Sequence, residues 1–282
     1  MRERPTERAS QTDLAREIRE TGVPEGAVAL WWLGQSSIVA KAAGRVVGFD
    51  LYLTDHGAAE AGLQRAYAPL VSPDELDMMD VVLCTHEHLD HLDPRTLAGI
   101  ARASPSAQLV VPHCCAGMVR AAGVDARRIQ RSWAGRPMAV RDLGIVPIRA
   151  AHETFDLVDQ GHRWQGYIVT MGGVTLCHTG DTVMYDGLAE ELRRHHVDVL
   201  LAPINGRDYH RNRASIIGNL NYRETAELAV EAQVKLVIPL HYDLFEPNVE
   251  RPGYFVDYLY DRFPAQPSKV MARGERFLFL SP

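Results

Sequence analysis

A short segment in the first half of the chain concentrates side chains that bind metal ions. Residues 81–84 are apolar and lead into the pattern His-x-His-x-Asp-His, formed by His86, His88, Asp90 and His91. In an extended segment residues two apart face the same way, so the first two histidines can approach one ion together. The last two ligands reach a neighbouring position after the chain turns. Zinc, manganese and iron accept this set of nitrogen and oxygen ligands, so the pattern predicts a metal site; a solvated charged turn is the alternative.

Further ligands must come from elsewhere, because one loop cannot complete a two-metal site. His152, Asp181 and His241 each directly follow an apolar, strand-like run. Taken singly, each would be a structural or surface residue, but three such residues complement the first motif and together predict a shared centre. Gly180 precedes Asp181 and allows the backbone to turn so that the carboxylate of Asp181 can bridge two ions.

Such a centre predicts hydrolysis without a serine or cysteine nucleophile. Two divalent ions about 3.5–4 Å apart lower the pKa of a bridging water towards 7 and polarise the bond that is attacked. We therefore assign catalytic roles to Asp181, as the bridge, and to Asp90, as the group that moves a proton to the leaving oxygen. Glu153 and His178 are expected to orient ligands, with a buried structural histidine as the equal alternative for His178.

The elements that position these residues alternate between strand and helix. An N-terminal helix is predicted over about residues 10–22, with Ser10 as its N-cap, Leu14 and Ile18 one turn apart, and Gly22 as its end. Strands are predicted over residues 28–33, 37–41, 45–50, 80–85, 108–111, 140–149, 165–171, 174–178, 197–201 and 234–240. Further helices are predicted after Asp93-Pro94 and over residues 187–194 and 222–232.

This order of elements predicts an α/β fold of two similar halves. Each half supplies strands and outer helices, which favours a four-layer αβ/βα sandwich of two mixed β-sheets packed face to face and flanked by helices. Residues 1–282 contain no low-complexity linker and are expected to form a single domain. The site should lie at the strand ends between the two halves.

Composition narrows the class of protein. The chain has 282 residues, of which 46% are hydrophobic and 23% charged, values that exclude intrinsic disorder and coiled coil. A net charge of −6 weighs against nucleic acid and anionic lipid as partners. No run approaches the roughly 18 apolar residues of a membrane span, and no signal sequence is evident, so a cytoplasmic protein is expected. Cys84 and Cys177 lie in apolar strands and are expected to be inert.

The ordered pattern His-x-His-x-Asp-His, then His, then Asp, then His resembles that of the metallo-β-lactamase-fold hydrolases. The resemblance implies that His86, His88 and His152 hold one metal ion. It also implies that Asp90, His91 and His241 hold the other and that Asp181 bridges them. The ions implied are one or two divalent metals, manganese or zinc, with iron as a third choice.

Within that superfamily, three segments are similar to the L-ascorbate-6-phosphate lactonase group. They are residues 29–34, residues 178–182 and residues 237–243. The similarity implies a cytoplasmic enzyme that uses manganese and acts on a small anionic substrate, specifically a sugar-phosphate lactone.

A polar loop after residues 197–201 supplies the predicted substrate-binding residues. Asn205 and the glycine after it can turn the chain so that Arg207 points into the cleft, where a guanidinium would bind a phosphate or carboxylate. A solvated loop with ion pairs to Asp208 and Glu224 is the alternative. Asn221 is predicted to cap the next helix, and Tyr222 is predicted to face the pocket.

The leading prediction is thus a metal-dependent hydrolase of a small anionic ester or lactone. A phosphodiesterase acting on a small phosphodiester or nucleic acid is the first alternative, because the same pair of ions serves phosphate esters. A non-catalytic metal-binding or iron redox protein is the alternative from another class. The sequence leaves open whether the protein forms a homo-oligomer.

Overall fold

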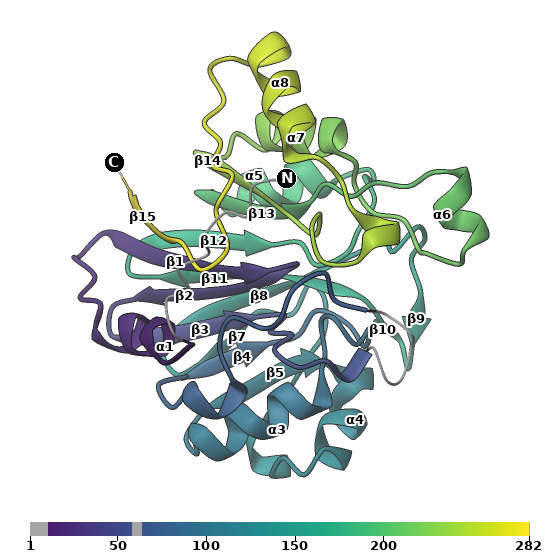
Figure 1. The fold of residues 1–282 in the computed structure, drawn as a ribbon. Coiled ribbons are helices and arrows are strands. Elements are labelled where there is room, and N and C mark those ends of the chain that lie inside the picture. Colours follow the sequence, from purple (N-terminus) through teal and green to yellow (C-terminus); the bar gives the residue numbers. More distant parts are fainter. Residues whose placement is uncertain (1–10, 58–63, 282) are drawn as a thin grey trace, which may run out of the picture.

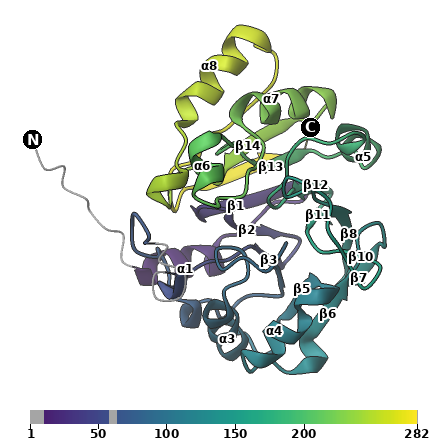
Figure 2. The ribbon, with the colours of Figure 1, turned by 90° about the vertical axis from the view of Figure 1, so that its right-hand side faces the viewer.

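The computed structural model describes residues 11–57 and 64–281, which build two mixed β-sheets with helices on their outer faces (Figure 1). The first sheet has seven strands in the order β15-β1-β2-β3-β4-β5-β6, and the second has six in the order β14-β13-β12-β11-β8-β7. Helices α7 and α8 lie at one side of the molecule and α3 and α4 at the opposite side, with the strands between them (Figure 2). The predicted four-layer αβ/βα sandwich is confirmed.

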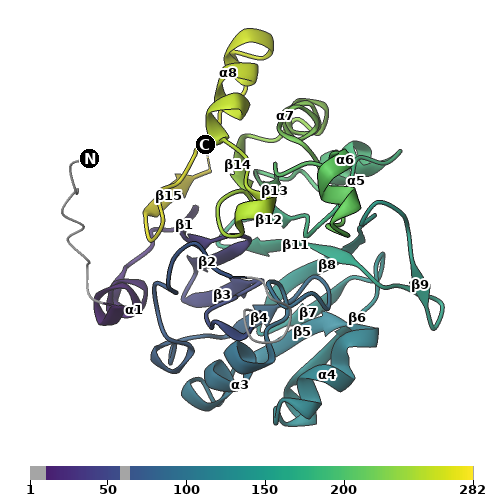
Figure 3. The same cartoon turned by 45° about the vertical axis from the view of Figure 1, so that its right-hand side comes forward.

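The strands of the first sheet are β1 (Ala27–Gly34), β2 (Ser37–Ala42), β3 (Arg45–Phe49), β4 (Val81–Leu83), β5 (Gln108–Pro112), β6 (Ile129–Ser132) and β15 (Arg276–Leu280). Those of the second sheet are β7 (Met138–Val140), β8 (Leu143–Arg149), β11 (Gln165–Met171), β12 (Val174–His178), β13 (Val199–Pro203) and β14 (Leu236–Leu240). A separate hairpin of β9 (Leu157–Val158) and β10 (Gly161–His162) projects at the edge of the molecule (Figure 3).

The helices are α1 (Gln11–Glu20), α3 (Pro94–Ala103), α4 (Ala116–Ala121), α5 (Leu188–Arg194), α6 (Tyr209–Arg213), α7 (Tyr222–Glu231) and α8 (Pro252–Arg262). Short 3₁₀ turns are η1 (Pro73–Glu75), η2 (His113–Cys115), η3 (Ala126–Arg128) and η4 (Glu246–Asn248). Asp93 caps α3 through a hydrogen bond from the backbone N–H of Arg95, as the Asp-Pro pair predicts. The predicted N-cap of α1, Ser10, lies outside the described residues.

The core between the sheets depends on the alternation of side chains along each strand. Every residue of β1 is buried, because this strand is covered on both faces. Trp32 packs in the core between the two sheets, whereas Trp31 packs on the outer face of the first sheet with the residues of α1. The indole N–H of Trp31 donates to the carboxylate of Glu17 in that helix at 3.1 Å. Both faces of the first sheet are therefore packed against other parts of the protein. A polar site at this sheet must lie where its strands end.

Strand direction brings the predicted ligands to one edge. Strand β12 is parallel to β13, and β13 is parallel to β14, so the residues that follow β12 and β14 leave the sheet at the same edge. Strand β11 is antiparallel to both β12 and β8, so β8 also ends at that edge. Strand β4 ends in the first sheet and delivers the His-x-His-x-Asp-His loop.

One predicted strand is wrong in its extent. Residues 140–149 were expected to form one strand, but they belong to two, β7 and β8, which pair in antiparallel register. Arg141 and Asp142 lie between them with φ of 52° and 66°, a left-handed turn that reverses the chain. The expectation of a single domain over residues 1–282 stays a prediction.

Candidate metal centre

Three histidines form the first group of the centre, which we call the three-histidine position. His86 Nε2 lies 3.0 Å from His88 Nδ1, and His152 Nε2 lies 3.3 Å from the same atom of His88. One ligand atom of each histidine lies within 4.8 Å of the others. The loop after β4 and the residues after β8 thus build one position together.

The second group, the carboxylate-rich position, contains Asp90, His91 and His241. Asp90 Oδ2 lies 3.5 Å from His91 Nε2 and 3.4 Å from His241 Nε2. Asp181 lies between the two groups: its Oδ1 is 3.3 Å from His91 Nε2, and its Oδ2 is 3.3 Å from His241 Nε2 and 3.7 Å from His152 Nε2. The structure therefore brings all seven predicted ligands together.

Within the described residues, two buried atoms of the centre form no hydrogen bond, although an ion-pair contact of 3.3 Å joins them to each other. They are His91 Nε2 and Asp181 Oδ1, and both belong to side chains that are at most 5% exposed. Buried polar atoms without hydrogen bonds are unfavourable, so a group that binds both would stabilise this arrangement. A divalent cation fits, because the donors are imidazole nitrogens and carboxylate oxygens only.

The two positions differ in their protonation. Burial lowers the pKa of His152 to about 4, and burial together with neighbouring histidines lowers the pKa of His86 well below its ordinary value. Burial also opposes charge on His241, but the carboxylates of Asp181 and Asp90 outweigh it and raise its pKa to about 9. Despite the same burial, carboxylates also raise the pKa of His91. In the three-histidine position, His86 and His152 are thus neutral near pH 7.

Asp50 orients His91, a role that sequence reasoning missed. Its Oδ2 lies 2.7 Å from His91 Nδ1, and the carboxylate also accepts from the backbone N–H and the hydroxyl of Thr85 at 2.8 and 2.7 Å. A carboxylate on one ring nitrogen directs the other nitrogen towards the metal. Asp50 directly follows β3, as other residues of the centre follow strands, but its partner His91 lies 41 residues away in the sequence.

Glu153 and His178 hold the backbone near two ligands. Glu153 Oε1 accepts from the N–H of Gly218 at 3.0 Å, and the carbonyl oxygen of Gly218 lies 3.3 Å from His152 Nδ1. His178 Nδ1 accepts from the N–H of Gly180 at 3.2 Å, so its Nε2 carries the proton and donates to Ser36 at 2.9 Å. His178 is therefore a satisfied buried histidine that also fixes the turn before Asp181.

The backbone around the centre is strained. Gly180 has φ of 62°, and a Cβ there would lie 2.8 Å from the carbonyl oxygen of Gln165, so no other residue fits. Four residues with side chains share the left-handed region: Gln35, Asp50, Glu153 and His241, with φ of 52°, 45°, 65° and 58°. Such conformations cluster at functional sites.

The predicted substrate-binding residues all have partners within the protein. Arg207 donates to both carboxylate oxygens of Glu224, at 2.8 and 2.7 Å, which is the alternative that the sequence left open. Asn205 is fully buried and donates to Asn248 at 3.0 Å. The ring of Tyr222 packs against two tyrosines of α8. A role in substrate binding stays a prediction for all three; the predicted cap of α7 by Asn221 is confirmed.

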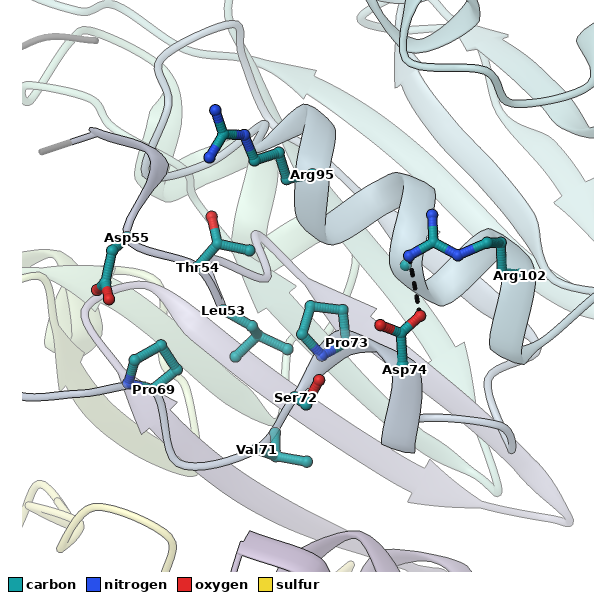
Figure 4. A pocket seen from close by; sticks show the side chains of 11 residues that line it. Leu53, Thr54, Asp55, Pro69, Val71, Ser72, Pro73, Asp74, Arg95 and Arg102 are labelled. Carbon is teal, nitrogen blue, oxygen red and sulfur yellow. Dashed lines mark hydrogen bonds and ion pairs between the residues drawn. The ribbon is translucent and has the colours of Figure 1, made fainter. Parts of the chain in front are cut away.

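A separate cavity of about 390 Å³ lies beside α3, on the outer side of the first sheet (Figure 4). Arg95 and Arg102 of α3 line it, and Arg102 is paired with Asp74 at 3.0 Å. None of the seven candidate ligands lines this cavity. It is a solvated notch apart from the metal centre.

The fold and the gathered side chains define the class, a metal-dependent hydrolase. The model of the beta-lactamase superfamily domain matches residues 48–242, and the chain belongs to this family. Over 267 residues it is 25% identical to the probable L-ascorbate-6-phosphate lactonase of Escherichia fergusonii, covering 82% of this chain and 74% of that protein. It is 30% identical over 187 residues to a metal-dependent hydrolase of Thermococcus kodakarensis, covering 66% of this chain and 76% of that one.

Solved structures share the fold at lower identity. The isothiocyanate hydrolase from Delia radicum gut bacteria has a TM-score of 0.71 at 18% identity, covering 90% of this chain and all of that one. Within the described residues, no helix has the length and apolar character to cross a membrane. The cytoplasmic location stays a prediction.

Proposed function

We propose that the protein hydrolyses a small anionic ester or lactone, and that a sugar-phosphate lactone is its substrate. The observation that carries the proposal is the pair of adjoining ligand groups with Asp181 between them. The similarity to a lactonase of L-ascorbate 6-phosphate supports the choice of substrate. We propose manganese or zinc as the metal, with iron as the third candidate.

In this proposal the chain holds two ions through separate ligand sets. His86, His88 and His152 would hold one, Asp90, His91 and His241 the other, and Asp181 would reach both. Divalent ions held by these residues would lower the pKa of a bound water towards about 7 and would polarise the bond that is broken. The protein supplies the position of these ligands, because each follows a strand end and is buried or nearly so.

Asp90 is the candidate for moving the proton to the leaving oxygen. Its side chain is 12% exposed, against 5% for Asp181, so it is the more accessible of the two carboxylates. Its Oδ2 faces His91, His241 and Gln35. Burial opposes charge on Asp90, but the imidazoles of His91 and His241 outweigh it and lower its pKa, so the carboxylate would start ionised and act first as the acceptor of the proton.

Trp164 and Arg163, which lie near the three-histidine position, would contact the substrate in this proposal. The ring of Trp164 lies edge-on to His152, with 5.5 Å between centroids. Arg163 pairs with Glu87 at 2.6 Å and with Asp156 at 3.1 Å and remains 40% exposed. An aromatic face beside a guanidinium suits an anionic ring compound.

The test is turnover by purified protein with its metal content measured in the same sample. The panel contains L-ascorbate 6-phosphate in its lactone form, simple lactones and bis(p-nitrophenyl) phosphate. We expect lactone opening that a chelator removes and that manganese or zinc restores. Activity on the phosphodiester alone would replace the lactone proposal with a phosphodiesterase, and bound iron without hydrolysis would replace it with a redox protein.

The roles proposed for Asn205, Arg207 and Tyr222 need a differential measurement, because Arg207 would have to exchange Glu224 for the substrate anion. If Arg207 binds the phosphate, Arg207→Ala raises KM for a phosphorylated lactone by about tenfold and leaves KM for the unphosphorylated lactone unchanged. Equal effects on both substrates would assign Arg207 to the structure of its loop.

A further inference from the structure

Gln35 occupies an unusual place for a polar residue in a turn. It lies between β1 and β2 and is only 3% exposed. Its φ of 52° is in the left-handed region, which is unfavourable for a residue with a side chain. The pairing of β1 with β2 shifts register between Trp32 and Gly34, so the turn is irregular. A buried polar residue in a strained turn beside the candidate metal centre indicates a functional role.

The backbone of Gln35 is held from both ends. Its N–H donates to Asp243 Oδ1 at 3.2 Å, and its carbonyl oxygen accepts from the backbone N–H of His241 at 3.1 Å and from the indole of Trp32 at 3.0 Å. Asp243 is itself fixed, because it accepts from Arg273 at 2.8 Å and from the hydroxyl of Tyr67 at 2.8 Å. These contacts set the direction of the Gln35 side chain.

That side chain ends at a predicted ligand. Gln35 Nε2 donates to Asp90 Oδ2 at 2.9 Å, the same oxygen that faces His91 and His241. The amide nitrogen also lies 3.1 Å from His241 Nε2. Among the described residues, Gln35 has no hydrogen bond to His86, His88 or His152. Its contacts therefore belong to the carboxylate-rich position alone.

We infer that Gln35 is a positioning residue for the carboxylate-rich metal position. It fixes the rotation of the Asp90 carboxylate, and with its carbonyl oxygen it fixes the backbone of His241, so that both ligands face one ion. The inference rests on the proposed metal centre. It predicts that loss of the Gln35 contacts weakens metal binding at the carboxylate-rich position and leaves metal binding at the three-histidine position unchanged.

The test compares binding of Mn²⁺ to full-length, chelator-stripped protein by calorimetry and by electron paramagnetic resonance. Gln35→Met keeps the length of the side chain and removes the donor. In the wild type we expect two binding steps, the first at the three-histidine position and the second at the carboxylate-rich position. Two bound Mn²⁺ ions should give a spin-coupled signal. In Gln35→Met the second step weakens at least about tenfold, the first is unchanged, and the coupled signal is lost at stoichiometric loading.

Gln165→Met is the matched control, because Gln165 is a buried glutamine that bonds to Ser132 and to the carbonyl oxygen of His162 instead of to a ligand. It should bind both ions as the wild type does. If circular dichroism shows that Gln35→Met does not fold, Asp243→Asn is tested instead. It removes the ion pair with Arg273 that fixes the acceptor of the Gln35 N–H, and it should weaken the second binding step alone.

The outcomes separate two failures. Wild-type binding of both ions by Gln35→Met, or equal weakening of both steps, overturns the role of Gln35 and leaves the metal centre intact. A wild type that binds a single ion, or none, overturns the proposed two-ion centre itself.

Discussion

The three-histidine position and the carboxylate-rich position share Asp181 and lie side by side, but their charges differ. The first presents His86, His88 and His152, and its two ligands with a lowered pKa, His86 and His152, are neutral near pH 7. The second combines Asp90 with His91 and His241, whose pKa values the carboxylates raise. Without an ion, the two imidazoliums of the second position form ion pairs with the carboxylates of Asp90 and of the shared Asp181.

This difference implies that the two positions have different requirements for binding. A cation entering the three-histidine position meets neutral imidazoles at His86 and His152. A cation entering the carboxylate-rich position must displace protons, but gains the attraction of Asp90. The orienting contacts differ as well: Asp50 and Gln35 support the second position through side chains, whereas a backbone carbonyl supports His152.

Replacing the shared ligand should have the largest effect, because Asp181 reaches both positions. We expect Asp181→Ala to lower turnover by at least about 100-fold, beyond the loss caused by removing an orienting partner, and to weaken both metal-binding steps. The variant should remain folded, since two sheets and their cores hold the fold. Wild-type rates in a metal-replete variant would contradict the bridging role.

Removing one histidine from each position would sharpen the comparison. His152→Ala should weaken metal binding at the three-histidine position by more than about tenfold. His241→Ala should weaken metal binding at the carboxylate-rich position by a similar factor. Metal content after dialysis against Mn²⁺ should then approach one ion per chain in each variant. If both variants lose both ions, the two positions are a single cooperative site.

The pH dependence of binding should differ between the positions. His241 has a pKa of about 9 without metal, so it retains its proton as the pH falls and competes with the cation. Affinity at the carboxylate-rich position should fall by about tenfold per pH unit for each proton displaced. Affinity at the three-histidine position should change less between about pH 6 and 8, because His152 has a pKa of about 4. Calorimetry in buffers of different ionisation enthalpy counts the protons released; equal release in both steps would refute the distinction.

Changes to the orienting partners should have the smallest effects. Asp50→Asn should weaken binding at the carboxylate-rich position by about tenfold, because His91 loses its charged acceptor. Glu153→Ala removes the acceptor of the Gly218 N–H and acts on His152 only through the backbone of Gly218. It should therefore weaken metal binding at the three-histidine position by only a few-fold. Titration with Mn²⁺ measures both, and a reversed order of effects would contradict the assignment.

The sequence predicted which side chains gather at the candidate centre because each is marked locally. His86, His88, Asp90 and His91 form one motif, and the other three ligands follow apolar runs that end at one edge of the sheets. Asp50 follows a strand in the same way but lacks a neighbouring histidine in sequence, since its partner His91 is 41 residues away. The position of an isolated residue in space depends on the pairing of strands, which local patterns do not encode.

The same limit explains what was missed in the fold and the substrate site. Strand β15 pairs with β1 from the other end of the described chain, a contact that no short-range pattern reveals. Arg207 lies on a polar loop, and the sequence alone offered a substrate anion, Asp208 and Glu224 as its partners, of which the structure shows Glu224. Choosing between such partners requires the packing of α7 against that loop.

The left-handed residues around the centre have an evolutionary consequence. Gln35, Asp50, Glu153 and His241 each hold a backbone conformation that is unfavourable by about 1–3 kcal/mol for a residue with a side chain. Replacement by glycine would relieve that strain, but it would also remove the side-chain hydrogen bonds to His91, Asp90 and the N–H of Gly218 that hold the centre in place. Selection for the centre, and not for the backbone, is therefore expected to keep these side chains where glycine would suit the chain better.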